Sequence, residues 1–368
     1  MKNHRIVDEF IELSKIDAPS KHEREIADVL TQKLLELGCI VREDDTAQKI
    51  GGNAGNILAV LPGTREGHIL FCAHMDRVEP GRGIKAIIHE DNTITSDGST
   101  ILAGDDLCGV TAILEGIRQV KEGGKTYPTI EIVFTVCEEI SLLGSRNLDY
   151  SKIQSRIGYV FDTSGNMGRI VAGAPYKGVL TLTVHGKASH AGNSPEKGVN
   201  AIMALAHILD GIPEGRISPT ATSNFGIIRG GENIGTVCDY AYVKAEVRNH
   251  SKKDLIKYYE MVKKHCEEKI KETAASLKID FVIDYEGFKI HENEPALKLL
   301  LNVLTEMAIT PSIQLGMGGM DANNFNSNGI QSLGVAAGYT DPHALYEKIM
   351  INELIRSAEI VRRLILSY

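Results

Sequence analysis

Three short apolar runs, each followed closely by a carboxylate or imidazole side chain, constrain the fold of this chain more than any other feature. The runs cover residues 68–73, 131–136 and 158–161. Their nearly unbroken hydrophobicity is typical of strands that are buried on both faces of a parallel sheet. A helical pattern of apolar residues separates the first two runs, from Asp105 to Val120. Strands that alternate with helices predict an α/β fold, in which a mixed sheet is sandwiched by helices.

The chain is too long for one hydrophobic core of usual size, and its pattern changes after Ala174. With 368 residues, two domains are the starting expectation. A β-α-β-β-α-β order follows Ala174 and predicts a ferredoxin-like α+β domain. Its expected strands lie at 178–186, 225–229 and 240–248, and its expected helices at 200–209 and 252–277. After the chain returns to the first domain, helices are expected at 294–308 and 350–366. We therefore expect a catalytic domain formed by residues 1–173 and 288–368, interrupted by a lid or dimerisation domain at 174–287.

The second of two expected N-terminal helices carries a start signal and a stop signal. Ser20 and Glu23 have the spacing of a capping box, in which each side chain accepts a backbone hydrogen bond from the other's residue. Gly38 follows the last apolar position and is typical of the residue that ends a helix in a left-handed conformation. The pattern predicts a helix between these signals.

Charge and composition argue against nucleic-acid and membrane partners. The formal net charge is −8, no long run of Lys or Arg occurs, and aromatic residues make up only 5% with no Trp. No uncharged stretch approaches the roughly 18 residues that span a bilayer. The N-terminus lacks the features of a signal peptide. The six cysteines are scattered without a CxxC pair, so we expect reduced, buried thiols in a cytoplasmic protein.

Metal-ligand side chains stand where each apolar run ends. His74 and Asp76 follow the first run, the pair 138–139 (both Glu) follows the second, and Asp162 follows the third. Sheets of this class bind ligands beyond the carboxyl ends of their strands. Imidazole nitrogen and carboxylate oxygen suit Zn²⁺ and its neighbours Co²⁺ and Mn²⁺. Asp76 is two residues from His74 on an extended segment, so we expect its carboxylate to accept the other imidazole N–H.

These residues, together with Asp105-Asp106 and a late His343, resemble the co-catalytic zinc peptidase family M20 in order and spacing. The resemblance covers essentially the whole length, and it is strongest to the branch of peptidase T, the tripeptide aminopeptidases. It implies two divalent metal ions, Zn²⁺ or alternatively Co²⁺ or Mn²⁺, bridged by Asp105. His74 and Asp162 would bind one ion. Glu139 and His343 would bind the other.

The resemblance also implies roles for the remaining candidate residues. Glu138 would be the general base, and His190, in the segment 186–192, would complete the active site, commonly from the partner subunit of a homodimer formed through the inserted domain. The implied substrate-binding positions are Asn233, Arg248, Gly318 and Gly319. A charge count agrees, because two divalent cations would balance three carboxylates and one bridging hydroxide.

Two positions depart from the family's usual pattern. Leu107 replaces the lysine that commonly follows the two aspartates, and Ala103-Gly104 replaces the commoner order Gly-Ala. Leu107 removes a positive charge near the site but no expected ligand, so we expect it to affect substrate preference more than catalysis.

The sequence therefore predicts a di-metal peptidase of short peptides, and the resemblance favours an aminopeptidase that releases the N-terminal residue of tripeptides. Two alternatives stay open. A metallo-carboxypeptidase or an N-acyl amino acid deacylase would use the same metal ligands. A catalytically dead peptide-binding relative is the other, although such a relative would usually have lost a ligand or the base.

Overall fold

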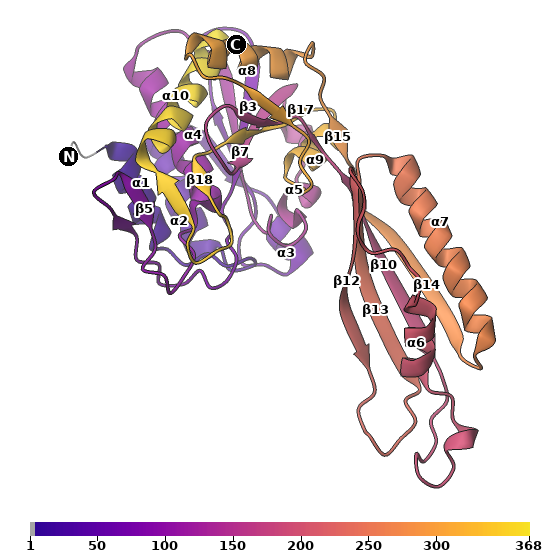
Figure 1. The fold of residues 1–368 in the computed structure, drawn as a ribbon. Coiled ribbons are helices and arrows are strands. Elements are labelled where there is room, and N and C mark those ends of the chain that lie inside the picture. Colours follow the sequence, from indigo (N-terminus) through magenta and orange to yellow (C-terminus); the bar gives the residue numbers. More distant parts are fainter. Residues whose placement is uncertain (1–3) are drawn as a thin grey trace. The chain divides into compact units, whose positions relative to one another are not determined.

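The computed structural model describes residues 4–368, and the chain divides into two units. The first unit contains the residues up to Gly173 and those from Lys289 to Tyr368, and the second contains Ala174–Phe288. Figure 1 shows the two units along the chain. No helix within residues 4–368 is long and apolar enough to cross a membrane. All six cysteines are free, and five of them are buried.

A mixed sheet forms the centre of the first unit. Among the described residues it has eight strands in the order β1-β2-β6-β3-β7-β17-β8-β16. Its strands are β1 (Ile40–Glu43), β2 (Ile57–Leu61), β3 (His68–His74), β6 (Thr129–Thr135), β7 (Ile157–Thr163), β8 (Arg169–Val171), β16 (Ser312–Gln314) and β17 (Gln331–Ala336). β3 runs parallel to both β6 and β7, and β7 runs parallel to β17. The three apolar runs of the sequence therefore lie side by side and end at one edge.

Helices cover this sheet, which confirms the expected α/β fold. The long helices are α1 (Arg5–Ser14), α2 (Arg24–Glu36), α4 (Gly104–Glu122), α8 (Pro295–Glu306) and α10 (Ile351–Ser367), and the short ones are α3 (Thr46–Ile50), α5 (Leu143–Asn147) and α9 (Ala322–Ser327). α4 packs on β3 and β7, and α10 packs on α4. A Cβ atom at Gly116 of α4 would lie 2.6 Å from Cβ of Val361. Glycine at this position therefore lets α4 and α10 approach closely.

A second, small sheet joins two distant hairpins of the first unit. Its order is β18-β19-β5-β4. The strands are β4 (Ile87–Ile88), β5 (Thr93–Thr95), β18 (Tyr339–Thr340) and β19 (Lys348–Met350). The hairpin expected between residues 84 and 96 is present, and its pairing with β19 fixes the loop that carries His343.

The capping-box prediction at Ser20 and Glu23 is wrong. α2 begins at Arg24, and its N-cap residue Glu23 makes no capping bond with its side chain. The hydroxyl of Ser20 instead donates to Oδ2 of Asp76 at 2.6 Å. The stop signal was correct, since Gly38 has a φ of 82° and the N–H of Cys39 bonds to the carbonyl of Leu34.

The second unit is an antiparallel sheet in the order β11-β12-β13-β10-β14. Its elements are β10 (Tyr176–His185), α6 (Ala201–Leu209), β11 (Gly215–Ser218), β12 (Ala221–Gly230), β13 (Tyr240–Asn249), α7 (Lys252–Lys269) and β14 (Ser276–Tyr285). Alternate residues of β10, such as Leu180, Leu182 and Val184, are buried in a core shared with α6 and α7. This is the expected ferredoxin-like arrangement.

The helix predicted at 252–277 is too long. α7 ends at Lys269, and a short 3₁₀ turn, η3 (Ile270–Glu272), follows it. From Ser276 the residues alternate between intermediate and exposed positions, which is the period of a strand. Other short elements are η1 (Tyr150–Lys152), η2 (Pro195–Lys197), β9 (Gly173–Ala174) and β15 (Phe288–Lys289).

Candidate active site

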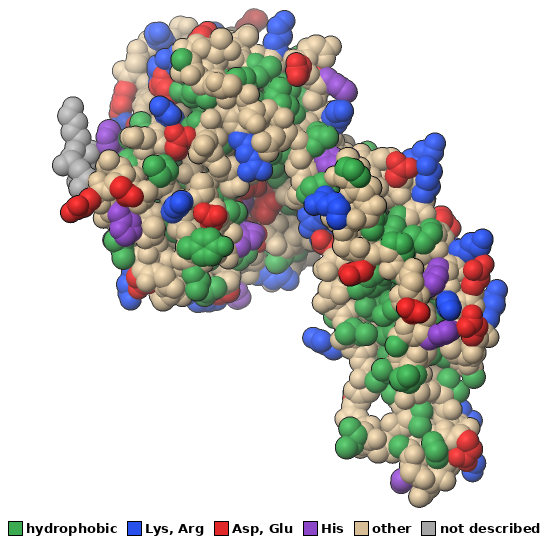
Figure 2. Space-filling view, in the orientation of Figure 1, with side chains coloured by type: hydrophobic (Ala, Val, Ile, Leu, Met, Phe, Trp, Pro, Cys, Tyr) green, Lys and Arg blue, Asp and Glu red, His purple; other side chains and the backbone are tan. Residues whose placement is uncertain are grey.

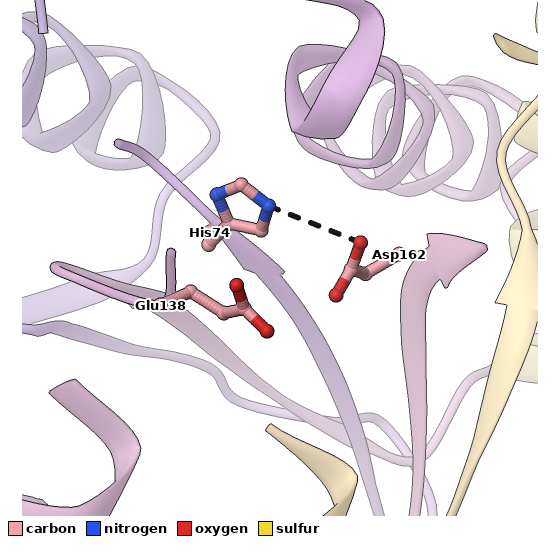
Figure 3. A group of neighbouring side chains, drawn as sticks. All are labelled: His74, Glu138 and Asp162. Carbon is pink, nitrogen blue, oxygen red and sulfur yellow. Dashed lines mark ion pairs between the residues drawn. The ribbon is translucent and has the colours of Figure 1, made fainter. Parts of the chain in front are cut away.

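The parallel strands bring three of the predicted site residues together at one edge of the sheet. β3 ends with His74, Glu138 follows β6, and Asp162 lies near the end of β7. Figure 3 shows the three side chains pointing toward one another, with Nε2 of His74 3.8 Å from Oδ1 of Asp162. His74 and Glu138 are buried, with relative exposures of 1% and 9%.

The carboxylate of Asp105 lies between two imidazoles. Its Oδ1 is 3.0 Å from Nε2 of His74, and its Oδ2 is 3.4 Å from Nε2 of His343. The same Nε2 of His343 lies 2.9 Å from Oε1 of Glu139. Burial alone would raise the pKa of Asp105, but the hydrogen bonds with His343 and His74 hold it well below its usual range. One oxygen of Asp105 therefore faces each imidazole.

Three overlapping groups of these side chains have the geometry to hold a metal ion. The ligand atoms within each group lie within 4.8 Å of one another. The groups are His74, Glu138 and Asp162; His74, Asp105 and Glu139; and Asp105, Asp106 and Asp162. The donors are imidazole nitrogens and carboxylate oxygens without a cysteine, a set that suits Zn²⁺, Co²⁺ or Mn²⁺.

Crowding of buried carboxylates shifts the pKa values across this cluster. Burial raises the pKa of Glu138 and of Asp162 well above the usual carboxyl range, and neighbouring carboxylates raise both further. Hydrogen bonds with Asp105 and Glu139 raise the pKa of His343 to about 10. Divalent cations would offset this excess of negative charge, so the residues present fit a metal centre.

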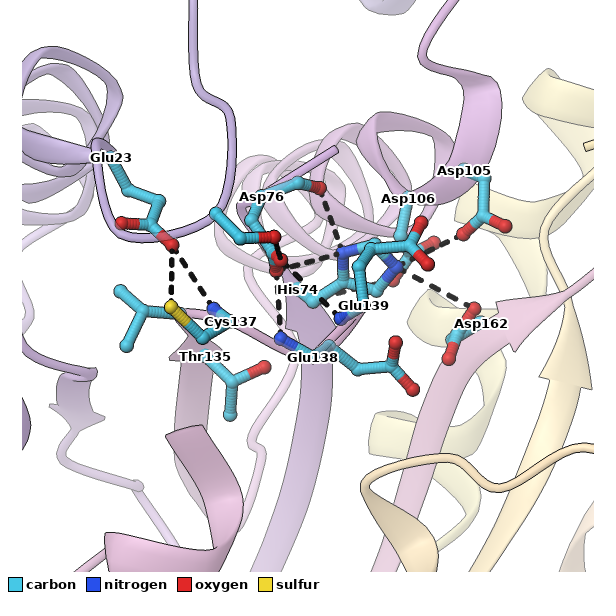
Figure 4. A network of polar contacts seen from close by, with 12 residues as sticks. Glu23, His74, Asp76, Asp105, Asp106, Thr135, Cys137, Glu138, Glu139 and Asp162 are labelled. Atoms are coloured by element: carbon cyan, nitrogen blue, oxygen red, sulfur yellow. Dashed lines mark hydrogen bonds and ion pairs between the residues drawn. The ribbon is translucent and has the colours of Figure 1, made fainter. Parts of the chain in front are cut away.

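The expected contact between His74 and the Asp76 carboxylate is only partly correct. Nδ1 of His74 lies 2.9 Å from the backbone carbonyl of Asp76 and 3.5 Å from its Oδ1. The carboxylate of Asp76 instead accepts from the N–H of Glu138 at 2.9 Å and from the N–H of Glu139 at 3.3 Å (Figure 4). Asp76 therefore orients the imidazole mainly through its backbone, and its side chain fixes the segment that carries the two glutamates.

Two family models match the chain, one in each unit. The model of the M20 peptidase dimerisation domain matches residues 178–274, and the model of peptidase family M28 matches residues 56–173. The M28 match includes every member of the cluster described above except His343.

Relatives that match over nearly the full length decide the family. Aminopeptidase PepT from Bacillus cereus ATCC 10987 is 38% identical, with a TM-score of 0.89, and the match covers 99% of this chain and 98% of that one. A tripeptidase from Staphylococcus aureus subsp. aureus Mu50 is 30% identical, with a TM-score of 0.92 and coverage of 98% and 97%. The uncharacterized protein YqjE of Bacillus subtilis (strain 168) is 36% identical over 358 residues, 97% of this chain and 96% of that one.

The chain belongs to the M20 peptidase family. Within that family it is PepT-like, and it is therefore a hydrolase of the peptidase class. A more distant structure shares the fold at 14% identity and a TM-score of 0.73. It is described as a dinuclear metal-binding peptidase of the M20 family from Bacillus subtilis.

The predicted residues of the inserted domain lie in the second unit of this M20 peptidase. Nδ1 of the exposed His190 accepts from the N–H groups of Gly192 and Asn193, at 3.1 and 3.2 Å. Asn233 lines a hollow of about 740 Å³ together with Arg229. Arg248 lies on β13 and is ion-paired with Glu246 at 3.0 Å.

The predicted substrate loop lies in the first unit, just before α9. Gly318 and Gly319 are partly or fully exposed, and the loop ends at the buried Asp321. Oδ2 of Asp321 accepts from the hydroxyl of Thr135 at 2.5 Å, which ties the end of the loop to β6. Leu107, which replaces the family's usual lysine, is 2% exposed and forms part of the core.

The sequence interpretation gave no role to three residues that support the cluster. Asp106, which is joined to Asp105 by a cis peptide bond, accepts from the N–H of His74 at 3.1 Å. The hydroxyl of Tyr339 donates to Oδ1 of Asp162 at 3.1 Å, and Glu347 accepts from the N–H of Asp105 at 3.0 Å. The adjacency of Asp106 to Asp105 was a signal for the first contact. The other two contacts join residues that are 177 and 242 positions apart, so no local pattern could assign these partners.

Proposed function

We propose that this M20 peptidase is a dinuclear aminopeptidase that releases the N-terminal residue of tripeptides and similar short peptides. The observation that carries the proposal is the position of Asp105, with one carboxylate oxygen toward His74 and the other toward His343. A carboxylate with this orientation can bridge two cations. The substrate class is supported by the names of the two full-length structural relatives, an aminopeptidase and a tripeptidase.

The proposed ligands divide into two sets that share Asp105. His74 and Asp162 would hold one cation, and Glu139 and His343 would hold the other. Zn²⁺ is the proposed ion, since all donors are nitrogen or oxygen, and Co²⁺ or Mn²⁺ could replace it. When bound, the two cations would polarise the scissile carbonyl and acidify the attacking water.

Glu138 is the proposed general base. Its carboxylate is buried next to Asp162, and burial together with this neighbour raises its pKa well above the usual carboxyl range, which favours uptake of a proton. Asp76 fixes the backbone N–H of Glu138, so the base is held in place from behind. Glu138 would remove a proton from water and then deliver it to the leaving amine.

His190 is the proposed donor to the developing oxyanion. Because Nδ1 accepts two backbone hydrogen bonds, the proton of a neutral ring resides on Nε2, which is free to donate. Asn233 and Arg248 are proposed to bind the substrate's carboxylate, and Gly318 and Gly319 to line its path in the first unit. Arg248 would have to exchange its ion pair with Glu246 for the substrate.

A homodimer formed through the second unit is part of the proposal. The match to a peptidase dimerisation domain supports it. Beyond Ser223, β12 pairs on one side only, with β13. Ile227 and Ile228 on this edge are 44% and 56% exposed, and Figure 2 shows hydrophobic side chains gathered on the second unit. An apolar strand edge of this kind is a common pairing surface.

Buried free thiols are consistent with the proposed cytoplasmic location.

The substrate proposal is tested by measuring amino acids released from free tripeptides, dipeptides, N-acetylated tripeptides and N-acyl amino acids, with Zn²⁺, Co²⁺ or Mn²⁺ and with a chelator. Metal-dependent cleavage of free tripeptides alone supports the aminopeptidase. Cleavage of blocked substrates would move the protein to the carboxypeptidase or deacylase class.

The base assignment is tested with Glu138→Gln. This variant should bind metal normally and lose several orders of magnitude in kcat, and full activity would refute the assignment.

Mixed dimers test whether His190 acts on the partner's site. His190→Ala and Glu138→Gln should each be nearly inactive alone. After the two variants are mixed and allowed to exchange subunits, a site with an intact Glu138 can receive His190 from the other subunit. Recovery of activity supports a shared site. Absence of recovery, with subunit exchange shown by a labelled partner, would mean that His190 does not act across the dimer.

A further inference from the structure

Glu347 holds the backbone that carries Asp105. This glutamate is 1% exposed and lies 242 residues after Asp105 in the chain. Its Oε2 accepts from the N–H groups of Leu102 and Ala103, at 2.8 and 3.0 Å, and its Oε1 accepts from the N–H of Asp105 at 3.0 Å. One carboxylate therefore fixes three backbone donors in a four-residue segment.

The segment that Glu347 binds does not hold this shape by its own preferences. Ala103 has a φ of 62°, in the left-handed region that residues with a side chain rarely adopt. At Gly104 a Cβ atom would lie 2.8 Å from Cβ of Tyr339 and 2.9 Å from Oε1 of Glu347. Such conformations persist where surrounding contacts determine them. The three hydrogen bonds to Glu347 are contacts of this kind for Ala103 and the residues around it.

Glu347 is also tied to His343, four residues before it. His343 and Asp341 have φ values of 64° and 58°, so this loop too is held in the left-handed region. The N–H of Glu347 closes the loop by donating to the carbonyl of Ala344 at 3.0 Å. β19 then begins at Lys348 and pairs with β18. The position of the Glu347 carboxylate is therefore linked to the position of the His343 ring.

We propose that Glu347 is a positioning residue that fixes the distance between Asp105 and His343 and so sets the cation affinity of the site. This inference rests on the proposed roles of Asp105 and His343 as metal ligands. It adds a connection between them. Oδ2 of Asp105 faces His343, and the backbone N–H of Asp105 is bound by Glu347, which lies on the same loop as His343. Loss of Glu347 frees both ligands.

Glu131 provides a matched control in the same unit. It is also a buried glutamate, at 4% exposure, whose carboxylate accepts backbone hydrogen bonds from a loop. Its partners are the N–H groups of Gln154 and Ser155, at 2.9 and 2.7 Å, and the hydroxyl of Ser155, at 2.5 Å, and neither residue belongs to the cluster. If the loss of a buried carboxylate has only a structural effect, that effect should therefore be equal at Glu347 and at Glu131.

The experiment compares the wild type with Glu347→Gln and Glu131→Gln after metal removal. The amide of glutamine would place an NH₂ group against at least one N–H donor of the 102–105 segment. Affinity for Zn²⁺ and for Mn²⁺ is measured by competition with a chromophoric chelator, and the melting temperature is measured in a chelator. Residues that orient metal ligands typically contribute a factor of 10 to 100 to affinity. We expect a 10- to 100-fold loss for Glu347→Gln and less than about a twofold change for Glu131→Gln.

Each outcome has a distinct meaning. Wild-type affinity in Glu347→Gln, or an equal loss in Glu131→Gln, would overturn the inference and leave the proposed function intact. A wild-type protein that binds no cation would refute the proposed function itself. If Glu347→Gln does not fold, Glu347→Asp gives the same readout, because a side chain shorter by one methylene withdraws the carboxylate from the three donors.

Discussion

The hydroxyl of Ser20 donates a hydrogen bond of 2.6 Å to Oδ2 of Asp76, across 56 residues of sequence. Asp76 is 1% exposed and also holds the backbone N–H of Glu138. Removal of the hydroxyl leaves the buried Asp76 carboxylate with one hydrogen bond fewer. Asp76 then holds the proposed base, Glu138, less firmly. We expect Ser20→Ala to lower kcat about 10-fold, with a smaller change in KM. Steady-state kinetics on a tripeptide at saturating metal measure this.

Ser357→Ala is the control for that substitution. Ser357 is fully buried in α10, and its hydroxyl bonds to the carbonyl of Leu354 at 2.7 Å, inside its own helix. Ser20 is half-buried. Each variant loses one hydroxyl that donates one hydrogen bond, so we expect both to lose a small amount of stability. Equal kcat values for the two variants would show that Ser20 has only a structural role.

Ser20 also shows why the sequence interpretation was incomplete. The spacing Ser20-x-x-Glu23 fits a capping box, and a local pattern cannot reveal that a tertiary partner competes for the hydroxyl. In the structure Asp76 is that partner. Glu23 is likewise used elsewhere, since its carboxylate accepts from the N–H of Cys137 at 3.1 Å. The pattern predicted a helix correctly and assigned its two signal residues to the wrong contacts.

Tyr339 is expected to affect the affinity for the cation that Asp162 is proposed to hold. Its hydroxyl donates to Oδ1 of Asp162 at 3.1 Å, and the ring is 2% exposed. Tyr339→Phe keeps the buried ring and removes only the hydrogen bond, so the carboxylate becomes less well oriented. We expect about a 10-fold weaker affinity for one of the two cations, read as a change in one step of a two-step metal titration.

Tyr159→Phe is the matched comparison for Tyr339→Phe. The Tyr159 ring is fully buried, and its hydroxyl donates to the carbonyl of Ala296 at 2.9 Å, away from the cluster. It should change stability without changing either step of the titration. A Tyr339→Phe protein that binds both cations as tightly as the wild type would contradict the prediction.

The crowded carboxylates predict that one substitution changes stability in opposite directions with and without metal. Burial and then Asp105 raise the pKa of Asp162, so the folded metal-free protein binds a proton there that the unfolded chain releases. Stability of the metal-free protein should therefore fall as the pH rises above the usual carboxyl range, and Asp162→Asn should reduce this fall. At pH 8 in a chelator we expect Asp162→Asn to melt higher than the wild type.

Addition of metal should reverse that order. A cation that binds only the folded state adds about 2.7 kcal/mol of stability at 100 times its Kd, and Asp162→Asn should lose most of this gain. Melting curves with and without Zn²⁺ test both signs. An Asp162→Asn protein that is less stable than the wild type in the chelator would mean that repulsion at Asp162 is not significant.

The strand ends were predictable from the sequence, and the contacts behind them were not. Apolar runs followed by His74, Glu138 and Asp162 have a local signature, because parallel strands present their carboxyl ends at one edge. The parallel arrangement of the strands is then enough to bring these side chains together. The supports Tyr339 and Glu347 lie on a hairpin whose position depends on β19 pairing with β5, more than 250 residues earlier. A single sequence carries no pattern for such a pairing.

The order Ala103-Gly104 gives the last prediction. In the family's commoner order, Gly-Ala, the glycine would occupy the left-handed position and the alanine the position beside Glu347. Ala103→Gly should relieve a left-handed conformation that costs about 1–2 kcal/mol but lose a buried methyl group of about 0.8 kcal/mol, so its net effect should be small. Gly104→Ala introduces a Cβ atom 2.8 Å from Cβ of Tyr339 and 2.9 Å from Oε1 of Glu347, and this crowding should lower the free energy of unfolding by about 1–3 kcal/mol.

The double variant should therefore be less stable than the wild type and bind metal more weakly, since Glu347 must move away from Asp105. Urea unfolding in a chelator and a metal titration measure the two effects, and a double variant equal to the wild type in both would show that this loop adapts to either order.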